Sequence, residues 1–169
     1  MESIKNMKGH VSDLVDKTVT GTFDTMFGRE VMSNASGEGA SAAGNGMGIA
    51  SHVRLTQGAA LNVGFSFHFD EGLLAAIAEE TYPEQARKIP MKLICEDMAC
   101  AIANVVGSRV KAFLNGHGYD LSMNIPAPGA DNDAGAAEEQ SYLSFIYGAQ
   151  SGQDAAVLVN IHLQEKRAG

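Results

Sequence analysis

One long amphipathic helix, expected over residues 96–111 and continuing to about Leu114, constrains the fold most strongly. At about 100° per residue, one side of this helix gathers large apolar side chains: Ile94, Met98, Ile102, Val105, Val106, Val110 and Phe113. The other side carries polar or small residues: Asp97, Ala101, Asn104, Ser108 and Lys111. The helix must therefore cover a larger core with one face and leave the other face free.

Two further helical segments are expected before this one. Apolar residues recur at helical spacing from Val11 to Phe27, and Gly28 can end that helix. Asp70 can cap a short second helix through its side chain. The segment from Tyr82-Pro83 to Pro90 then interrupts the helical pattern before the long helix begins.

The remaining periodic segments alternate in the manner of β-strands. Residues 49–55 and 61–69 alternate around Gln57-Gly58, which predicts a hairpin. Further strands are expected at 30–33, 119–125, 142–147 and 156–163. The order of elements predicts an α+β fold, one domain over 1–169, with a largely antiparallel sheet and helices over one or both of its faces.

Two segments read as loops. Residues 34–48 are rich in Gly, Ala and Ser and predict a flexible connection. Residues 127–139 are acidic and lack apolar anchors. The acidic loop does not have the ligand spacing or the closing helix of a helix-loop-helix calcium site.

Charge and length exclude several classes of function. The chain has 169 residues, 20 acidic and 12 basic, for a formal charge of −8, which argues against binding to nucleic acid or to anionic membranes. Its first residues lack the apolar core of a signal peptide, and no run approaches the roughly 20 apolar residues of a spanning helix. A cytoplasmic protein is expected.

Familiar catalytic and metal-binding patterns are missing. Cys95 and Cys100 lie five apart on a helix, so they point in different directions and are expected to be free thiols. His52 and His68 share a face of the hairpin, where they are either a metal pair or simply half-exposed strand residues. There is no Gly-x-Ser-x-Gly elbow and no phosphate-binding loop.

The amide of Asn104 is therefore the main candidate for chemistry. A side-chain amide can orient water or a ligand, but it serves as neither nucleophile nor general base. Any reactive group would have to come from a partner. The competing interpretation is that Asn104 is an ordinary solvated surface residue.

The layout resembles the CheC/CheX family of chemotaxis phosphatases, and CheX more than CheC because it has only one such helix. The resemblance covers nearly the full chain, from the first helix ending Phe23-Asp-Thr-Met-Phe-Gly28, through the hairpin, to the late segment Leu121-Ser-Met-Asn-Ile-Pro126. The strongest match is Asp97-Met-Ala-Cys-Ala-Ile-Ala-Asn104, which is similar to the family's Glu-x-x-Asn helix with its preceding acidic residue.

The resemblance implies a reaction and a partner. Family members hydrolyse the aspartyl phosphate of a CheY-type response regulator, and the Asn aligns the attacking water. The regulator supplies the phosphoryl group, the Mg²⁺ ion and a Lys, so no cofactor of the chain's own is expected. The main role left to this chain is to position the attacking water. Asn104 would carry that role, and a homodimer is expected by analogy, with edge strands such as Tyr142–Tyr147 supplying the contact.

The chain departs from the family pattern at two positions. Ala101 stands where the signature Glu is expected, and Ser108 replaces the usual Gly, with Gly107 just before it. Losing the charge-assisted contact of that Glu would cost about 1.5–3 kcal/mol, or roughly 10- to 150-fold. Asp97, about 20° around the helix but about 10 Å along it from Asn104, is a strained substitute.

Two functions therefore stay open. The first is a weakened phosphatase that uses Asn104. The second is a non-catalytic adaptor that binds a response regulator, or a flagellar or signalling partner, through the same helix face. Lys111 is either solvated or in contact with an acidic regulator surface. Ala101 favours the adaptor, since small residues also suit close packing of helices.

Overall fold

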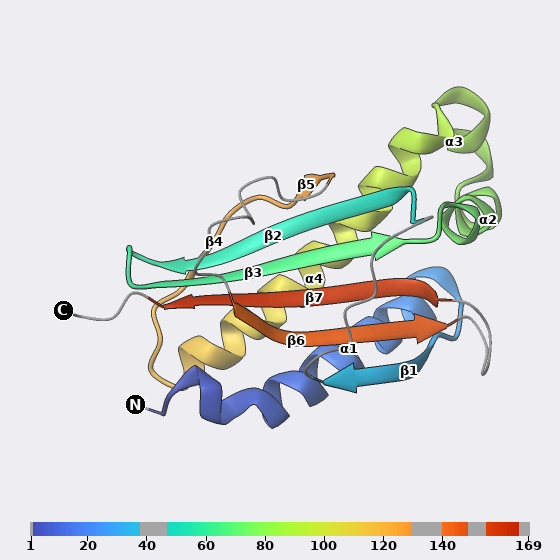
Figure 1. Cartoon of the computed structure of the whole chain (residues 1–169). Helices are drawn as coiled ribbons and strands as arrows, with labels where there is room; N and C mark the ends of the chain where they lie inside the picture. Colours follow the sequence, from blue (N-terminus) through green and yellow to red (C-terminus); the bar gives the residue numbers. More distant parts are fainter. Residues whose placement is uncertain (1, 38–46, 130–139, 149–154, 166–169) are drawn as a thin grey trace.

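The structure, a computed structural model, describes residues 2–37, 47–129, 140–148 and 155–165. A seven-stranded antiparallel sheet has the order β1-β6-β7-β3-β2-β4, and β5 also pairs with β2 (Figure 1). The strands are β1 (Met32–Gly37), β2 (Ile49–Gln57), β3 (Leu61–Phe69), β4 (Ser122–Met123), β5 (Ala127–Pro128), β6 (Gln140–Gly148) and β7 (Ala155–Glu165). The helices are η1 (Ile4–Met7), α1 (Lys8–Phe27), α2 (Glu71–Thr81), α3 (Pro83–Lys88) and α4 (Met91–Gly116). The α+β prediction is confirmed.

Both long helices lie on the same face of the sheet. Figure 1 shows α1 and α4 side by side behind the strands, with α2 and α3 beyond one end of the sheet. Helix α4 packs mainly on β2, and α1 lies beside α4 and contacts β6. Strand alternation sends Val53, Phe67 and Val159 into the core, where each is fully buried. These side chains give the two helices one common apolar surface to cover.

The ends of two helices follow from local chemistry as expected. Gly28 ends α1 in the left-handed region at φ 60°, and its N–H donates to the Asp24 carbonyl at 3.1 Å. A residue without a Cβ adopts this conformation without strain. The Asp70 carboxylate caps α2 by accepting from the Leu73 N–H at 2.9 Å. The interruption after Tyr82 contains α3, a short helix that the sequence pattern did not predict.

Helix α4 approaches β2 closely at Gly107. A Cβ added to Gly107 would lie 3.1 Å from Val53 Cγ1 and 3.0 Å from Met123 Sδ. The buried Ser51 hydroxyl on β2 donates to the Ala99 carbonyl of α4 at 2.9 Å. Glycine and this hydrogen bond fix both the distance and the register of α4 on the sheet, and hence the residues that α4 presents outward.

The segment after α4 returns along the edge of the sheet beside β2. The strand expected over 119–125 is wrong in extent, because only Ser122–Met123 and then Ala127–Pro128 pair with β2. Asn115 closes the turn with two bonds, from its Nδ2 to the Leu121 carbonyl at 3.1 Å and from the Leu121 N–H to its Oδ1 at 2.8 Å. The prolines at 126 and 128 limit regular pairing because they lack an N–H donor.

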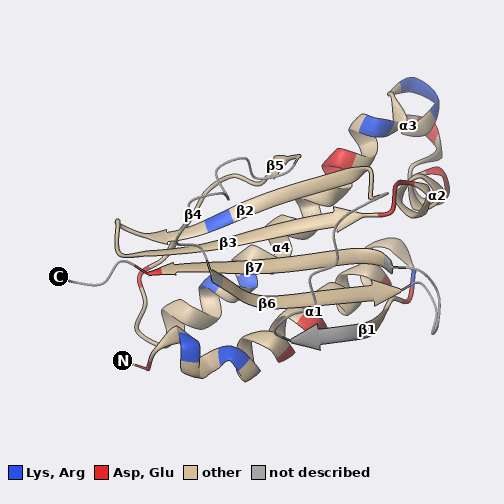
Figure 2. Cartoon of the chain, viewed as in Figure 1, with Lys and Arg blue, Asp and Glu red and all other residues tan. Residues whose placement is uncertain are grey.

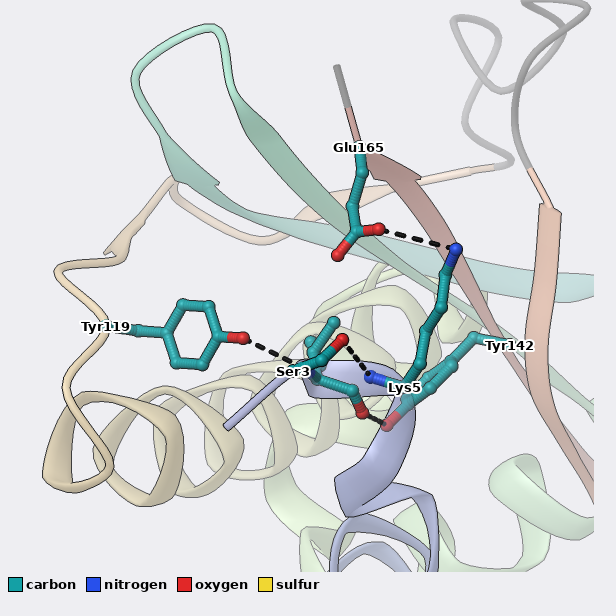
Figure 3. Close-up of polar contacts among 6 residues, drawn as sticks. Ser3, Lys5, Tyr119, Tyr142 and Glu165 are labelled. Atoms are coloured by element: carbon teal, nitrogen blue, oxygen red, sulfur yellow. Dashed lines mark hydrogen bonds and ion pairs between the residues drawn. The ribbon is translucent and has the colours of Figure 1, made fainter. Parts of the chain in front are cut away.

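The N-terminal residues are held by two tyrosines (Figure 3). The buried Tyr142 hydroxyl donates to the Ile4 carbonyl at 2.5 Å. The Tyr119 hydroxyl accepts from the Ile4 N–H at 2.8 Å and donates to the Glu2 carbonyl at 3.0 Å. Lys5 pairs with Glu165 at 3.4 Å at the end of β7. These contacts close the core beneath η1, whose Ile4 is fully buried.

Three expectations need correction or fall outside the described residues. Strand β1 continues to Gly37, so it takes in the first part of the loop expected at 34–48, and residues 38–46 lie outside the described ranges. Strand β5 and the bond from the Gly129 N–H to Ala50 occupy the start of the acidic loop, and residues 130–139 are not described. Strand β6 lies between β1 and β7, so Tyr142–Tyr147 is not an edge.

Among the described residues, no helix is both long enough and apolar enough to cross a bilayer.

Candidate functional site

The outward face of α4 carries the residues that the sequence singled out. Asp97 and Asn104 are exposed, and Ala101, Ser108 and Lys111 are half-buried. The opposite side is in the core as predicted, with these residues buried: Ile94, Met98, Ile102, Val106 and Val110. The apolar side is narrower than expected because Val105 and Phe113 are only half-buried.

Asn104 is the exposed amide at the middle of this face. Among the described residues, no hydrogen bond involves its side chain. Its carbonyl oxygen and its NH₂ group are therefore both available to water or to a partner. An amide that is exposed, unused by the fold and mounted on a rigid helix has the properties that a water-orienting group needs.

Ser108 and Lys111 continue the face toward the C-terminal end of α4. The Ser108 hydroxyl points to the thioether of Met123, with an Oγ–Sδ distance of 3.8 Å, so it packs against the returning segment. Lys111 makes no ion pair with any described residue. Of the two, Lys111 is the group that can meet a charge on a partner.

A pocket of about 250 Å³ opens beside Ala101. Its walls come from the end of α1, from α3 and its flanking residues, and from the N-terminal half of α4. Met26, Tyr82, Ile89 and Met98 make it mainly apolar, and Asp97 is its one ionisable carboxylate. The sequence pattern did not predict this pocket, because its walls are distant in sequence and join only through packing. The one sequence feature that could have indicated the pocket is Ile89, an apolar residue near the end of the mainly polar segment from Pro83 to Pro90.

Cys100 lies near the outward face of α4, whereas Cys95 is in the core, and neither thiol is activated for chemistry. Both cysteines are free, with Cys95 buried and Cys100 half-buried, as predicted. Burial, and then the carboxylates of Asp97 and Glu96, raise the pKa of the Cys100 thiol. A raised pKa lowers the thiolate fraction, so Cys100 is a poor nucleophile at neutral pH.

The histidines of the hairpin are half-buried strand residues. Ser66, not His68, lies opposite His52 across the β2–β3 pair. His52 Nδ1 lies 2.8 Å from the Gly129 carbonyl, and burial lowers the pKa of His68. Within the described ranges, no three side chains of His, Cys, Asp or Glu come together in a way that could hold a metal ion.

Comparisons with known proteins show the fold. No protein-family model matches the sequence, and no curated protein is similar to it in sequence. Among solved structures, the chemotaxis protein CheX from Vibrio vulnificus matches with a TM-score of 0.70 at 18% identity, over 92% of this chain and 99% of that chain. A CheC-like superfamily protein from Shewanella sp. PV-4 matches at 0.66 and 14% identity, over 96% and 99%.

A third match was solved with a partner. It is a CheX from Borrelia burgdorferi in complex with CheY, BeF₃ and Mg²⁺, with a TM-score of 0.67 at 13% identity, over 90% of this chain and 97% of that chain. The resemblance seen in the sequence is therefore confirmed as a shared fold that spans nearly the whole chain.

Proposed function

We propose that this chain is a CheX-like protein of the cytoplasm that hydrolyses the aspartyl phosphate of a CheY-type response regulator. The observation that carries the proposal is the exposed, unpartnered amide of Asn104 on α4. Two facts support it: the shared fold, and a solved relative of that fold bound to CheY with BeF₃, a mimic of the phosphoryl group, and Mg²⁺.

The reaction requires little covalent chemistry from this chain. The oxygen of a water molecule attacks phosphorus, the bond between phosphorus and the aspartyl oxygen breaks, and inorganic phosphate and a free carboxylate result. The Asn104 carbonyl would accept a hydrogen bond from that water and so hold its oxygen in line with the breaking bond. Mg²⁺ and the regulator's Lys would neutralise the charge that develops on the phosphoryl oxygens.

Ala101 sets the expected strength of this activity. A methyl group cannot pair with the regulator's Lys, so the rate or the affinity should fall below that of a site with Glu, by roughly 10- to 150-fold. Asp97 is exposed on the same face and is the nearest candidate for a substitute. Its separation of about 10 Å along the helix from Asn104 makes that pairing strained.

The second candidate is an adaptor without catalysis. Ala101 is half-buried and lines an apolar pocket, which favours contact over charge pairing at this position. The substitution Ala101→Glu separates the two functions. With the receiver domain saturated, so that any change in affinity does not enter the rate, it should accelerate hydrolysis if Asn104 is in a productive position, and it should leave the rate unchanged if the face serves only for docking.

A homodimer is part of the proposal. The sheet ends at β1 on the side away from β4, and β1 pairs with β6 among the described strands. The second edge of β1 is where another copy could add a strand. Sedimentation velocity at several concentrations measures the oligomeric state.

The test of the proposed function is the decay of a phosphorylated receiver domain from the same organism, in Mg²⁺, with and without this protein. Wild-type protein should accelerate the decay, and the Asn104→Ala variant should not. Binding without acceleration would leave the adaptor, and neither binding nor acceleration would refute both functions.

A further inference from the structure

We propose that the pocket beside Ala101 receives an apolar side chain from the acidic phosphoacceptor face of the response regulator. This inference rests on the proposed function and adds an anchor to it. The pocket would thus replace the charge contact that Ala101 cannot make. Four observations carry the inference: the position of the pocket, the exposed apolar residues around it, its size, and the charge of α3 and α4.

The pocket is continuous with the face that carries Asn104. Asp97 and Ala101 belong to that face and also line the pocket. Ala101 lies about 4.5 Å along the helix from Asn104, less than one turn away. A partner whose phosphorylated site reaches Asn104 therefore also covers the mouth of the pocket.

Apolar side chains are exposed around this mouth. In the part of the chain that the structure describes, five large apolar residues are exposed, and three of them lie here: Met26 at 40%, Ile89 at 43% and Leu93 at 51%. Met26 and Ile89 line the pocket, and Leu93 lies one turn before the pocket residue Asp97 on the same side of α4. Clustered exposed apolar residues mark interaction surfaces more often than scattered ones do.

The size of the pocket fits a side chain. Its volume of about 250 Å³ is below the roughly 300–1,000 Å³ of typical small-molecule sites. A leucine-, methionine- or phenylalanine-sized group would be buried there as an anchor in a desolvated pocket. A longer residue at position 101 would project toward this space, so the small Ala101 keeps it open.

The charge of α3 and α4, two of the three helices that frame the pocket, favours an acidic partner, whereas the pocket lining itself has one charged group, Asp97. The whole chain has a formal charge of −8, yet the segment from α3 to the end of α4 has more cations than carboxylates. The cations are Arg87, Lys88, Lys92, Arg109 and Lys111, and the carboxylates are Glu84, Glu96 and Asp97. Figure 2 shows Lys and Arg on α3 and toward both ends of α4. A phosphoacceptor site, with its aspartates and phosphoryl group, is complementary to this arrangement.

The test measures binding separately from turnover. The probe is each CheY-type receiver domain of the source organism, held in its phosphorylated form with BeF₃⁻ and Mg²⁺, and the Kd is measured by calorimetry. Ile89→Ser removes a pocket wall at a residue that is 43% exposed, and Ala101→Leu fills the pocket. The matched control is Ile125→Ser, since Ile125 is 88% exposed and lies outside the pocket.

The expected result is a Kd raised about 10- to 100-fold by Ile89→Ser and by Ala101→Leu, because one buried apolar side chain loses its contacts. Ile125→Ser should bind within twofold of wild type. Higher salt should weaken binding by wild-type protein, as expected for opposite charges. Circular dichroism should show that all three variants are folded like wild type.

Two outcomes would overturn the inference, and they differ from a failure of the proposed function. If the pocket variants bound like wild type, or if the control variant weakened binding as much as they did, the pocket would not be an anchor for the partner. The proposed function would survive that result, provided that Asn104→Ala still abolished turnover. If no receiver domain bound or was dephosphorylated by wild-type protein, the proposed function would fail and the pocket inference with it.

Discussion

We call the two hydrogen bonds between Asn115, at the end of α4, and the backbone of Leu121 the Asn115 clasp. Its contribution to stability can be measured against a matched substitution in the same helix. Asn115 makes two hydrogen bonds to the backbone of Leu121, at 2.8 and 3.1 Å, and Leu121 is 2% exposed. Asn115→Ala removes both bonds and leaves an N–H and a carbonyl unpaired in a poorly hydrated position. Asn104→Ala makes the same chemical change in the same helix, but Asn104 is exposed and its amide makes no hydrogen bond to the described residues.

The expected difference in the free energy of unfolding follows from comparing Asn115→Ala with Asn104→Ala. Each lost hydrogen bond costs about 0.5–1.5 kcal/mol, and an unpaired buried group adds to that cost. Ala has the higher helix propensity, but the gain is full at Asn104 in the middle of α4 and smaller at Asn115 in its last turn, so this contribution does not reduce the expected difference. Asn115→Ala should therefore be less stable than Asn104→Ala by about 2–3 kcal/mol. At about 2–4 °C per kcal/mol for a chain of this size, the two Tm values should differ by about 4–12 °C.

Thermal and urea unfolding, followed by circular dichroism at 222 nm, measure this difference. Asn104→Ala should unfold within about 0.5 kcal/mol of wild type, as is usual for an exposed residue. If Asn115→Ala were as stable as Asn104→Ala, the two hydrogen bonds of Asn115 would contribute nothing to stability, and Asn115 would not hold the returning segment.

Three further predictions concern packing, pH and the thiol. Gly107→Ala should be less stable than Gly21→Ala by about 1–3 kcal/mol in urea unfolding, because a Cβ at Gly107 would lie 3.1 Å from Val53 whereas Gly21 in α1 has open space; equal stabilities would contradict the close approach of α4 to β2. Burial raises the pKa of Tyr142 and of Tyr147, the latter also through Asp16. Above pH about 10 the unfolded chain therefore loses phenolic protons that the folded chain keeps, and the free energy of unfolding falls by up to about 1.4 kcal/mol per pH unit for each tyrosine. Urea unfolding between pH 9 and 11 should show a flatter decline for the Tyr142→Phe and Tyr147→Phe double variant, and an unchanged slope would count against burial as the cause. Cys100 should react with iodoacetamide at pH 7.5 more slowly than free cysteine, and Asp97→Asn should speed that reaction; no change would mean that the carboxylate does not act on the thiol.

The periodic parts of the chain were predictable because one physical signal controlled each of them. Alternation placed Val53 and Phe65 in the core of the hairpin, and helical spacing placed Ile102 and Val106 beneath α4. Gly28 and Asp70 ended and began helices through local backbone chemistry. The exposed Asn104 also followed from spacing alone, since its position is fixed by the apolar side of its own helix.

The predictions from the sequence failed where distant parts of the chain meet. Residues 119–125 alternate like a strand, yet the Asn115 clasp and Pro126 limit their pairing to Ser122–Met123. The segment Tyr142–Tyr147 was expected at an edge of the sheet, but β1 pairs with the outer side of β6. Local periodicity does not determine the order of strands in a sheet. The pocket beside Ala101 joins α1, α3 and α4, so no single stretch of sequence reveals it.

We propose that Asn104 contributes to the rate of hydrolysis and to neither folding nor docking. The most direct measurement compares the decay rate of one phosphorylated receiver domain in the presence of saturating wild-type protein and of saturating Asn104→Ala. The Kd of each protein for the same domain is measured in BeF₃⁻ and Mg²⁺. The variant should bind within twofold of wild type while the phosphate decays at the receiver's own rate. Decay as fast as with wild-type protein would contradict the claim.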